Sequence, residues 1–182
     1  ELKKRMTEKD NYDLIDSIIV KTQGFVNGNI KEGDQNPVAI FKSHLALYDG
    51  IGKDQLRQNM KYFLDKIMPV CEKYDIQMCV HPDDPPFSLL GLPRIVTNEE
   101  DIDWLMNAVT NSHNGLTFCT GSLSAGLQND VPQLARKYAH RTKFVHLRST
   151  NVFDNGDFIE AGHLEGRGKI IDVVRIFEKE NP

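Results

Sequence analysis

Three side chains of the types that bind metal ions stand at the ends of short predicted strands. His81 ends the run "QMCVH", Cys119 ends "GLTFC", and His146 ends "TKFVH". They are 38 and 27 positions apart, and each interval is about the length of one βα unit. Because the carboxyl ends of parallel strands meet at one rim of a barrel, two imidazoles and a thiolate placed there could surround one cation. The sequence therefore predicts a metal site formed by His81, Cys119 and His146.

Other polar residues beside these strand ends are candidates for binding a substrate. Arg148 lies on the same side of the third strand as its histidine, and a guanidinium group suits a substrate carboxylate. Asp83 and Asp84 are candidates for contacts with substrate hydroxyl groups, or for support of His81. His163, in "EAGHLEG", is a candidate for proton transfer. Each also has an ordinary structural interpretation, such as a salt bridge for Arg148.

Several similar residues are predicted to have structural roles instead. Cys71, late in a helix, and Cys79, in the middle of a strand, are interpreted as packing residues. Arg94, in "GLPRI", and Ser122, in "TGSLS", are interpreted as loop structure.

The hydrophobic pattern predicts strands that alternate with helices. The helix over residues 52–75 has one apolar face, and Pro69 is expected to kink or shorten it. Asn98 is expected to cap the helix that follows it. The remaining predictions are helices over 1–20, 98–110, 131–140 and 168–181, strands over 77–81, 115–121 and 142–149, and a loop over 22–37. Such alternation predicts a parallel α/β sheet or barrel.

Composition limits the classes of function. The chain has 182 residues, 40% of them hydrophobic and 26% charged, with a net charge of -4, so general affinity for nucleic acid is not expected. No apolar run approaches the roughly 18 residues that cross a membrane, and no membrane association is expected. The three cysteines have no framework spacing, which favours a cytoplasmic location. The absence of an initiator methionine suggests that the sequence begins partway through a gene product.

Four segments together resemble the mannonate dehydratase family, from about residue 37 to residue 168. They are "YDGIGKDQLRQNMKYFL", "VHPDDPPFSLLGLPRIV", "NGLTFCTGS" and "FVHLRSTNVFDNGDFIEAGHLEG". The resemblance implies a (β/α)8 TIM barrel related to the xylose-isomerase-like barrels, of which this chain covers the central to C-terminal portion. Residues 1–182 would then form a single domain, with an N-terminal helix and loop over 1–36 and the motif-bearing βα units over 37–182.

The resemblance also implies a lyase activity. Members of this family are hydro-lyases that dehydrate D-mannonate to 2-dehydro-3-deoxy-D-gluconate in hexuronate (glucuronate) breakdown. His81, Cys119 and His146 match the family's metal-binding histidine, cysteine and histidine. Thiolate and imidazole ligands alone would favour zinc, whereas the resemblance implies Mn2+ or Fe2+. It further implies a small sugar acid as the partner and a homo-oligomer.

The sequence departs from the family pattern near its end. The family has a further metal-binding aspartate and a catalytic histidine in an Arg-Pro-Asp-His-Gly-like segment, while this sequence closes on "EKENP". "GKIIDVV" also stands where the family has Asp-Met-Tyr. The main acid–base residue is therefore expected outside these residues. Two alternatives stay open, a metal-dependent sugar isomerase or epimerase on the same barrel and a truncated, non-catalytic half-barrel.

Overall fold

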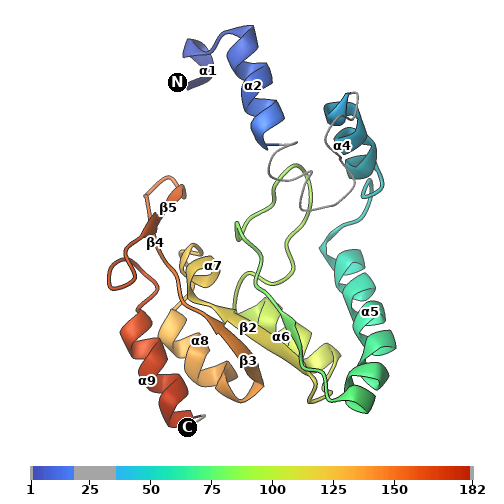
Figure 1. The fold of residues 1–182 in the computed structure, drawn as a ribbon, viewed down its shortest axis with the longest axis vertical. Coiled ribbons are helices and arrows are strands. Elements are labelled where there is room, and N and C mark those ends of the chain that lie inside the picture. Colours follow the sequence, from blue (N-terminus) through green and yellow to red (C-terminus); the bar gives the residue numbers. More distant parts are fainter. Residues whose placement is uncertain (1, 19–35, 181–182) are drawn as a thin grey trace. The chain divides into compact units, whose positions relative to one another are not determined.

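The computed structural model describes residues 2–18 and 36–180 (Figure 1). The chain divides into two compact units, Glu1–Ile51 and Gly52–Pro182. Each unit is described by itself, and the single-domain arrangement stays a prediction.

The first unit is helical. Helices α1 (Leu2–Arg5) and α2 (Glu8–Ile18) occupy most of the segment predicted as one helix, and its residues 19 and 20 lie outside the described part. The two helices are separate because Thr7 and Asp10 cap the start of α2. Thr7 N donates to Asp10 Oδ2 at 2.9 Å, and Asp10 N donates to Thr7 Oγ1 at 3.2 Å. Most of the predicted loop over 22–37 also lies outside the described residues. Helix α4 (Pro37–Ala46) begins with proline after the cap Asn36.

The second unit contains a parallel three-stranded sheet, as the alternating pattern predicts. Strands β1 (Met78–Val80), β2 (Asn114–Cys119) and β3 (Thr142–His146) lie in the order β1-β2-β3. The register pairs Val80 with Leu116 and Cys119 with His146. Figure 1 shows helix α6 on the connection between β1 and β2 and helix α8 on that between β2 and β3. The mixed α/β class is confirmed, and β1, β2 and β3 form an open three-stranded sheet.

Four longer helices accompany the sheet: α5 (Lys53–Tyr74), α6 (Glu99–Ala108), α8 (Val131–Tyr138) and α9 (Ile170–Glu180). The prediction that Pro69 could shorten α5 is wrong, since the helix continues past it to Tyr74. Asp75 ends α5 in the left-handed conformation, with φ 52°. Asn98 caps α6 as predicted, because its side chain accepts a hydrogen bond from Asp101 N at 3.0 Å. None of the helices described is long and apolar enough to cross a membrane.

The rim at the carboxyl ends of the strands carries two elements that the sequence analysis did not predict. A short helix, α7 (Thr120–Ser124), follows β2 directly. The third strand ends at His146 rather than at 149, and the chain then enters an antiparallel hairpin of β4 (Ser149–Val152) and β5 (Phe158–Ala161). Asp154 and Asn155 form the turn between these strands, and Gly156, with φ 86°, closes it by donating its N–H to the carbonyl of Phe153 at 2.9 Å.

The apolar core of the second unit lies between the sheet and its helices. Its members are almost fully buried and come from α5, α6, β2, α8 and α9, including Leu64, Ile102, Leu105, Leu116, Phe118, Leu134 and Val173. Burying an aliphatic or aromatic side chain of this size contributes about 1.5–3 kcal/mol. Cys71 belongs to this core, which confirms its packing role. Packing of the core therefore fixes the position of β2 and of its last residue, Cys119.

Asp101 is a charged residue that this unit buries completely, with 0% of its surface exposed. One carboxylate oxygen contacts Lys53 Nζ at 2.6 Å and Arg57 Nη2 at 2.7 Å. The other accepts from Thr97 N at 3.0 Å and Thr97 Oγ1 at 2.7 Å. Burial raises the pKa of Asp101, but hydrogen bonds from Lys53 and Thr97 outweigh it and leave the pKa below its ordinary value. The carboxylate therefore joins the start of α5 to the start of α6.

We predict that Asp101→Asn lowers the free energy of unfolding by roughly 3 kcal/mol, because it leaves two cations without their anion. Since the pKa is depressed in the folded state, the stabilisation is present above the ordinary aspartate pKa of about 4 and is lost as the pH falls below it. Urea unfolding at neutral pH and at pH 3 measures both effects. Glu100→Gln is the control. The Glu100 side chain is 81% exposed, and its Oε1 lies 3.8 Å from Arg57 Nη2, which is a longer contact than those of Asp101. Equal unfolding midpoints for the two variants at neutral pH would contradict this assignment.

Candidate functional site

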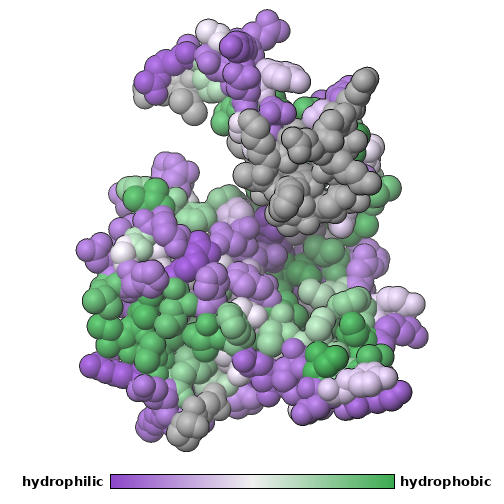
Figure 2. Space-filling view, viewed as in Figure 1, coloured by the Kyte–Doolittle hydropathy of each residue, from purple (hydrophilic) through white to green (hydrophobic). Residues whose placement is uncertain are grey.

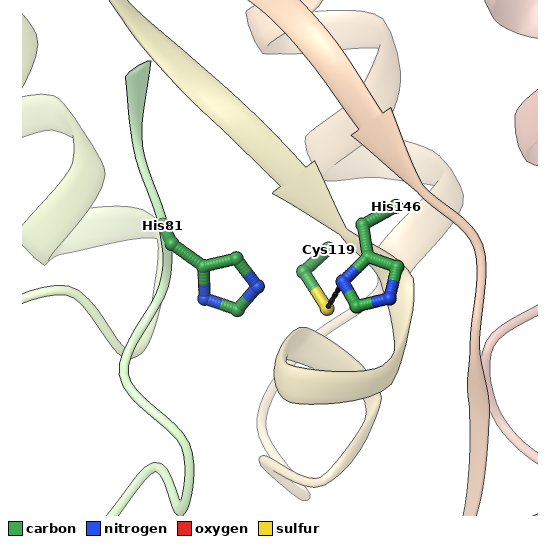
Figure 3. Close-up of side chains that lie close together, drawn as sticks. All are labelled: His81, Cys119 and His146. Carbon is green, nitrogen blue, oxygen red and sulfur yellow. Dashed lines mark hydrogen bonds between the residues drawn. The ribbon is translucent and has the colours of Figure 1, made fainter. Parts of the chain in front are cut away.

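The structure brings His81, Cys119 and His146 together at the carboxyl ends of the parallel strands (Figure 3). One ligand atom from each residue lies within 4.8 Å of the others. Cys119 Sγ is 3.5 Å from His146 Nδ1, and the two imidazole centroids are 5.8 Å apart. Cys119 is completely buried, whereas the imidazoles are accessible to solvent. The predicted convergence of these three side chains is therefore present.

The backbone explains this convergence. Cys119 and His146 are register partners on β2 and β3, so the parallel ladder places them side by side. His81 comes directly after β1, and its Nδ1 lies 2.7 Å from the carbonyl oxygen of Pro82. Because a carbonyl can only accept, Nδ1 is the donor in this contact, and Nε2 is the ring nitrogen that does not face the carbonyl. Figure 3 shows the other ring nitrogen of His81 pointing toward Cys119 and His146.

The spacing and chemistry of these atoms fit a divalent cation. A cation about 2.0–2.3 Å from each ligand holds neighbouring ligand atoms about 3–4 Å apart. The 3.5 Å between Cys119 Sγ and His146 Nδ1 lies in that range, and all three donor atoms lie within 4.8 Å of one another. Sulfur and nitrogen donors are ligands that transition-metal ions accept. With three donors supplied, such an ion would keep coordination positions for substrate oxygens.

Arg148 lies beside this cluster, but two carboxylates already hold its guanidinium group. Nε and Nη2 donate to Glu160 Oε1 and Oε2 at 2.9 and 2.8 Å, and Nη1 donates to Asp84 Oδ2 at 3.0 Å. These hydrogen bonds, with Glu160 the strongest contributor, raise the pKa of Arg148, while burial opposes them. The pKa of Glu160 is lowered, first by Arg148 and, more weakly, by the charges of His163 and His146. Three of the five N–H donors of Arg148 are thus in use.

A close approach between α7 and the strand end sets the position of Arg148. A Cβ atom on Gly121 would lie 2.6 Å from Arg148 Cβ, so a larger residue at 121 would displace the arginine. Thr120 Oγ1 also accepts a hydrogen bond from Arg148 N at 2.8 Å. These two contacts therefore fix the position of Arg148 relative to the end of β2.

Asp83 faces the backbone of its own loop. Its Oδ2 accepts from Ile95 N at 2.7 Å and Val96 N at 2.8 Å, and its Oδ1 lies 3.7 Å from Arg94 Nη1. Asp83 N also donates to the carbonyl of Val96 at 2.8 Å. These contacts close the loop that begins after His81, which is a structural role; binding of substrate by Asp83 stays a prediction.

Two residues of this rim were not predicted as part of the site. Glu160 was missed because the β4–β5 hairpin was missed, although "FDNGDF" carries an Asn-Gly turn signal between apolar residues. Ser122 was interpreted as loop structure, yet its side chain contacts both Cys119 and Asp84. His163 is exposed in the turn after β5, and its charge contributes to the lowered pKa of Glu160. Its role in proton transfer stays a prediction.

The comparisons with known proteins concern one family. The family model described as D-mannonate dehydratase (UxuA) matches residues 2–181, so the similarity also includes residues 2–36. The chain is 39% identical over 181 residues to a mannonate dehydratase of Geobacillus thermodenitrificans, covering 96% of this chain and 49% of the relative. It is 43% identical over 139 residues to mannonate dehydratase 1 of Halalkalibacterium halodurans, covering 76% of this chain and 38% of the relative.

A solved structure agrees with these relatives. The crystal structure of mannonate dehydratase from Streptococcus suis serotype 2 superimposes with a TM-score of 0.75 and 31% sequence identity. The match covers 81% of this chain and 44% of that one. The chain thus spans about half the length of the relatives that it matches, or less.

We predict that Asp83→Ala lowers the free energy of unfolding by about 1–3 kcal/mol, because two backbone N–H groups lose their acceptor. Asp83→Asn is the matched variant, since its amide oxygen can still accept both hydrogen bonds. Denaturant unfolding measures the stability, and amide hydrogen exchange reports on Ile95 and Val96 directly. Unchanged exchange at these two amides in Asp83→Ala would contradict the proposed closure of the loop.

Proposed function

Because this chain belongs to the D-mannonate dehydratase (UxuA) family, we propose that the protein is a hydro-lyase that converts D-mannonate to 2-dehydro-3-deoxy-D-gluconate and water in glucuronate catabolism. The observation that carries this proposal is the cluster of His81, Cys119 and His146 at one rim of the sheet. We also propose a cytoplasmic location and a homo-oligomer, as expected from the cysteine content and the resemblance.

The complete fold that we propose is a (β/α)8 barrel. Its support is the parallel sheet, in which the strand order follows the chain order. Within the described residues, β3 pairs with β2 on one edge, and a groove of about 400 Å³ lies beside β3 and α9. Phe144 in this groove is 61% exposed, and Figure 2 shows apolar side chains gathered near the start of α9. A further strand beside β3 would satisfy this edge and bury these side chains.

We propose that His81, Cys119 and His146 hold Mn2+ or Fe2+. The three side chains provide two imidazole nitrogens and one sulfur atom at suitable spacing. A divalent cation held by these residues would supply Lewis acidity, which would stabilise negative charge developing on the substrate. The choice of Mn2+ or Fe2+ over zinc rests on the family, not on the ligands.

The proposed reaction removes a proton from C2 and a hydroxide from C3. A base takes the C2 proton, an acid protonates the departing C3 hydroxyl group as water, and the enol that remains becomes the 2-keto acid. Of the residues described, His163 is the candidate for one proton transfer. Arg148 is the candidate for the substrate carboxylate, and the two N–H donors that Glu160 and Asp84 leave are the ones available to bind it. Asp84 and Asp83 are the candidates for contacts with substrate hydroxyl groups.

We predict that the protein loaded with Mn2+ forms a 2-keto-3-deoxy acid from D-mannonate, and that His146→Ala lowers this rate at least about 100-fold. The estimate is a lower bound, because loss of a residue that only supports a ligand can cost that much. A colorimetric assay for the keto acid measures the rate. His140→Ala is the control, since His140 is an exposed histidine outside the cluster. Formation of an isomer or epimer without loss of water would overturn the dehydratase proposal in favour of an isomerase.

We predict that Co2+, used as a spectroscopic probe, gives a sulfur-to-metal charge-transfer band, and that Cys119→Ser abolishes it. A bond from sulfur to cobalt is needed for this band, so the measurement tests Cys119 as a ligand without requiring activity. Cys79→Ser is the control, because Cys79 lies in β1, is only partly buried and is not a member of the cluster. Retention of the band in Cys119→Ser would exclude this cysteine as the ligand.

A further inference from the structure

The hydroxyl group of Ser122 lies between the sulfur of Cys119 and the carboxylate of Asp84. Ser122 Oγ is 3.2 Å from Cys119 Sγ and 3.1 Å from Asp84 Oδ2, and the residue is 1% exposed. A hydroxyl group has one proton to donate. The two acceptors therefore compete for it.

The backbone of Ser122 is directed at the same sulfur. Cys119 is the residue that caps α7, and its Sγ accepts from Ser122 N at 3.5 Å. One residue thus provides two donors, N–H and O–H, to one sulfur atom. Because α7 fixes the backbone of Ser122, both donors hold Sγ on the side from which it reaches His146 Nδ1 at 3.5 Å.

Arg148 weakens the competition for the hydroxyl proton. Its Nη1 donates to the same oxygen of Asp84 that faces Ser122, at 3.0 Å. A charged donor makes a stronger hydrogen bond to a carboxylate than a hydroxyl group does. Glu160 holds the other side of the guanidinium group with two hydrogen bonds. With the charge of Asp84 partly balanced by Arg148, the Ser122 hydroxyl proton can be shared between the carboxylate and the sulfur.

We propose that Ser122 is a positioning residue of the metal centre, which orients the Cys119 sulfur toward the cation through its O–H and N–H groups. The chain Glu160–Arg148–Asp84 orients Ser122 in turn. This inference rests on the cation proposed above to bind His81, Cys119 and His146. It gives Asp84 and Arg148 a role in supporting the ligand, in addition to the substrate contacts proposed for them.

The test compares Ser122→Ala with Ser124→Ala in the purified protein. Both serines are buried in α7, at 1% and 0% exposure, but the Ser124 hydroxyl group bonds to Gly121 O and Thr150 Oγ1. Calorimetric titration with Mn2+ alone should show affinity about 10- to 100-fold weaker for Ser122→Ala, which is the range for loss of a group that supports a ligand. Affinity within about 3-fold of the wild type is expected for Ser124→Ala.

A spectroscopic measurement separates positioning of the ligand from a general loss of stability. With Co2+ bound, the sulfur-to-metal charge-transfer band of Ser122→Ala should shift to lower energy, because the sulfur loses a hydrogen bond that stabilises its electrons. The band of Ser124→Ala should stay in place, and thermal melting of both variants shows whether α7 is intact.

The outcomes distinguish this inference from the proposed function. Wild-type affinity and an unshifted band in Ser122→Ala would overturn the role of Ser122 and leave the metal centre intact. Equal weakening in both variants would also overturn it, since helix stability would then be the cause. A wild-type protein that binds neither Mn2+ nor Co2+ would overturn the metal centre and this inference together.

Discussion

The parallel pairing of β2 with β3 is the interaction on which the site depends. It makes Cys119 and His146 neighbours across the ladder, although they are 27 positions apart in the sequence. The core residues Leu116 and Phe118, both 0% exposed, anchor β2 in this register. A slip of one residue would turn Cys119 to the opposite face of the sheet. The geometry of the cluster is therefore determined by packing of the core more than by contacts among the three side chains themselves.

A second layer of charge surrounds the cluster. Arg148, Asp84 and Glu160 come from three different segments, and each pairs with another through hydrogen bonds of 2.8–3.0 Å. Because these groups are partly exposed, each pair alone contributes little to stability. Their contribution is geometric, since together they hold the loop after His81, the end of β3 and the β4–β5 hairpin at one rim.

The sequence predicted the parts of this structure that have strong local signals. The apolar face of α5 and the Asn98 cap follow from periodicity and capping, and the structure agrees. The two strands that carry Cys119 and His146 were also predicted, although both end earlier than the predicted residues 121 and 149. The hairpin was missed because the predicted strand continues to residue 149, and no glycine or proline follows His146 to mark its end. The pairing of Arg148 with Glu160 could not be predicted without that hairpin. The contact of Ser122 with the sulfur depends on α7, which has too few residues to show a helical period.

The long intervals between the three cluster residues have a thermodynamic consequence. A cation held by His81, Cys119 and His146 would close loops of 38 and 27 residues and act as a cross-link between three βα units. Because the unfolded chain does not hold the three ligands together, binding of the ion would stabilise the folded state by mass action, unlike a disulfide, which restricts the unfolded chain. The ion would then act as a reversible cross-link. A chelator would remove the ion and also lower the stability of the carboxyl-end rim that carries the three ligands.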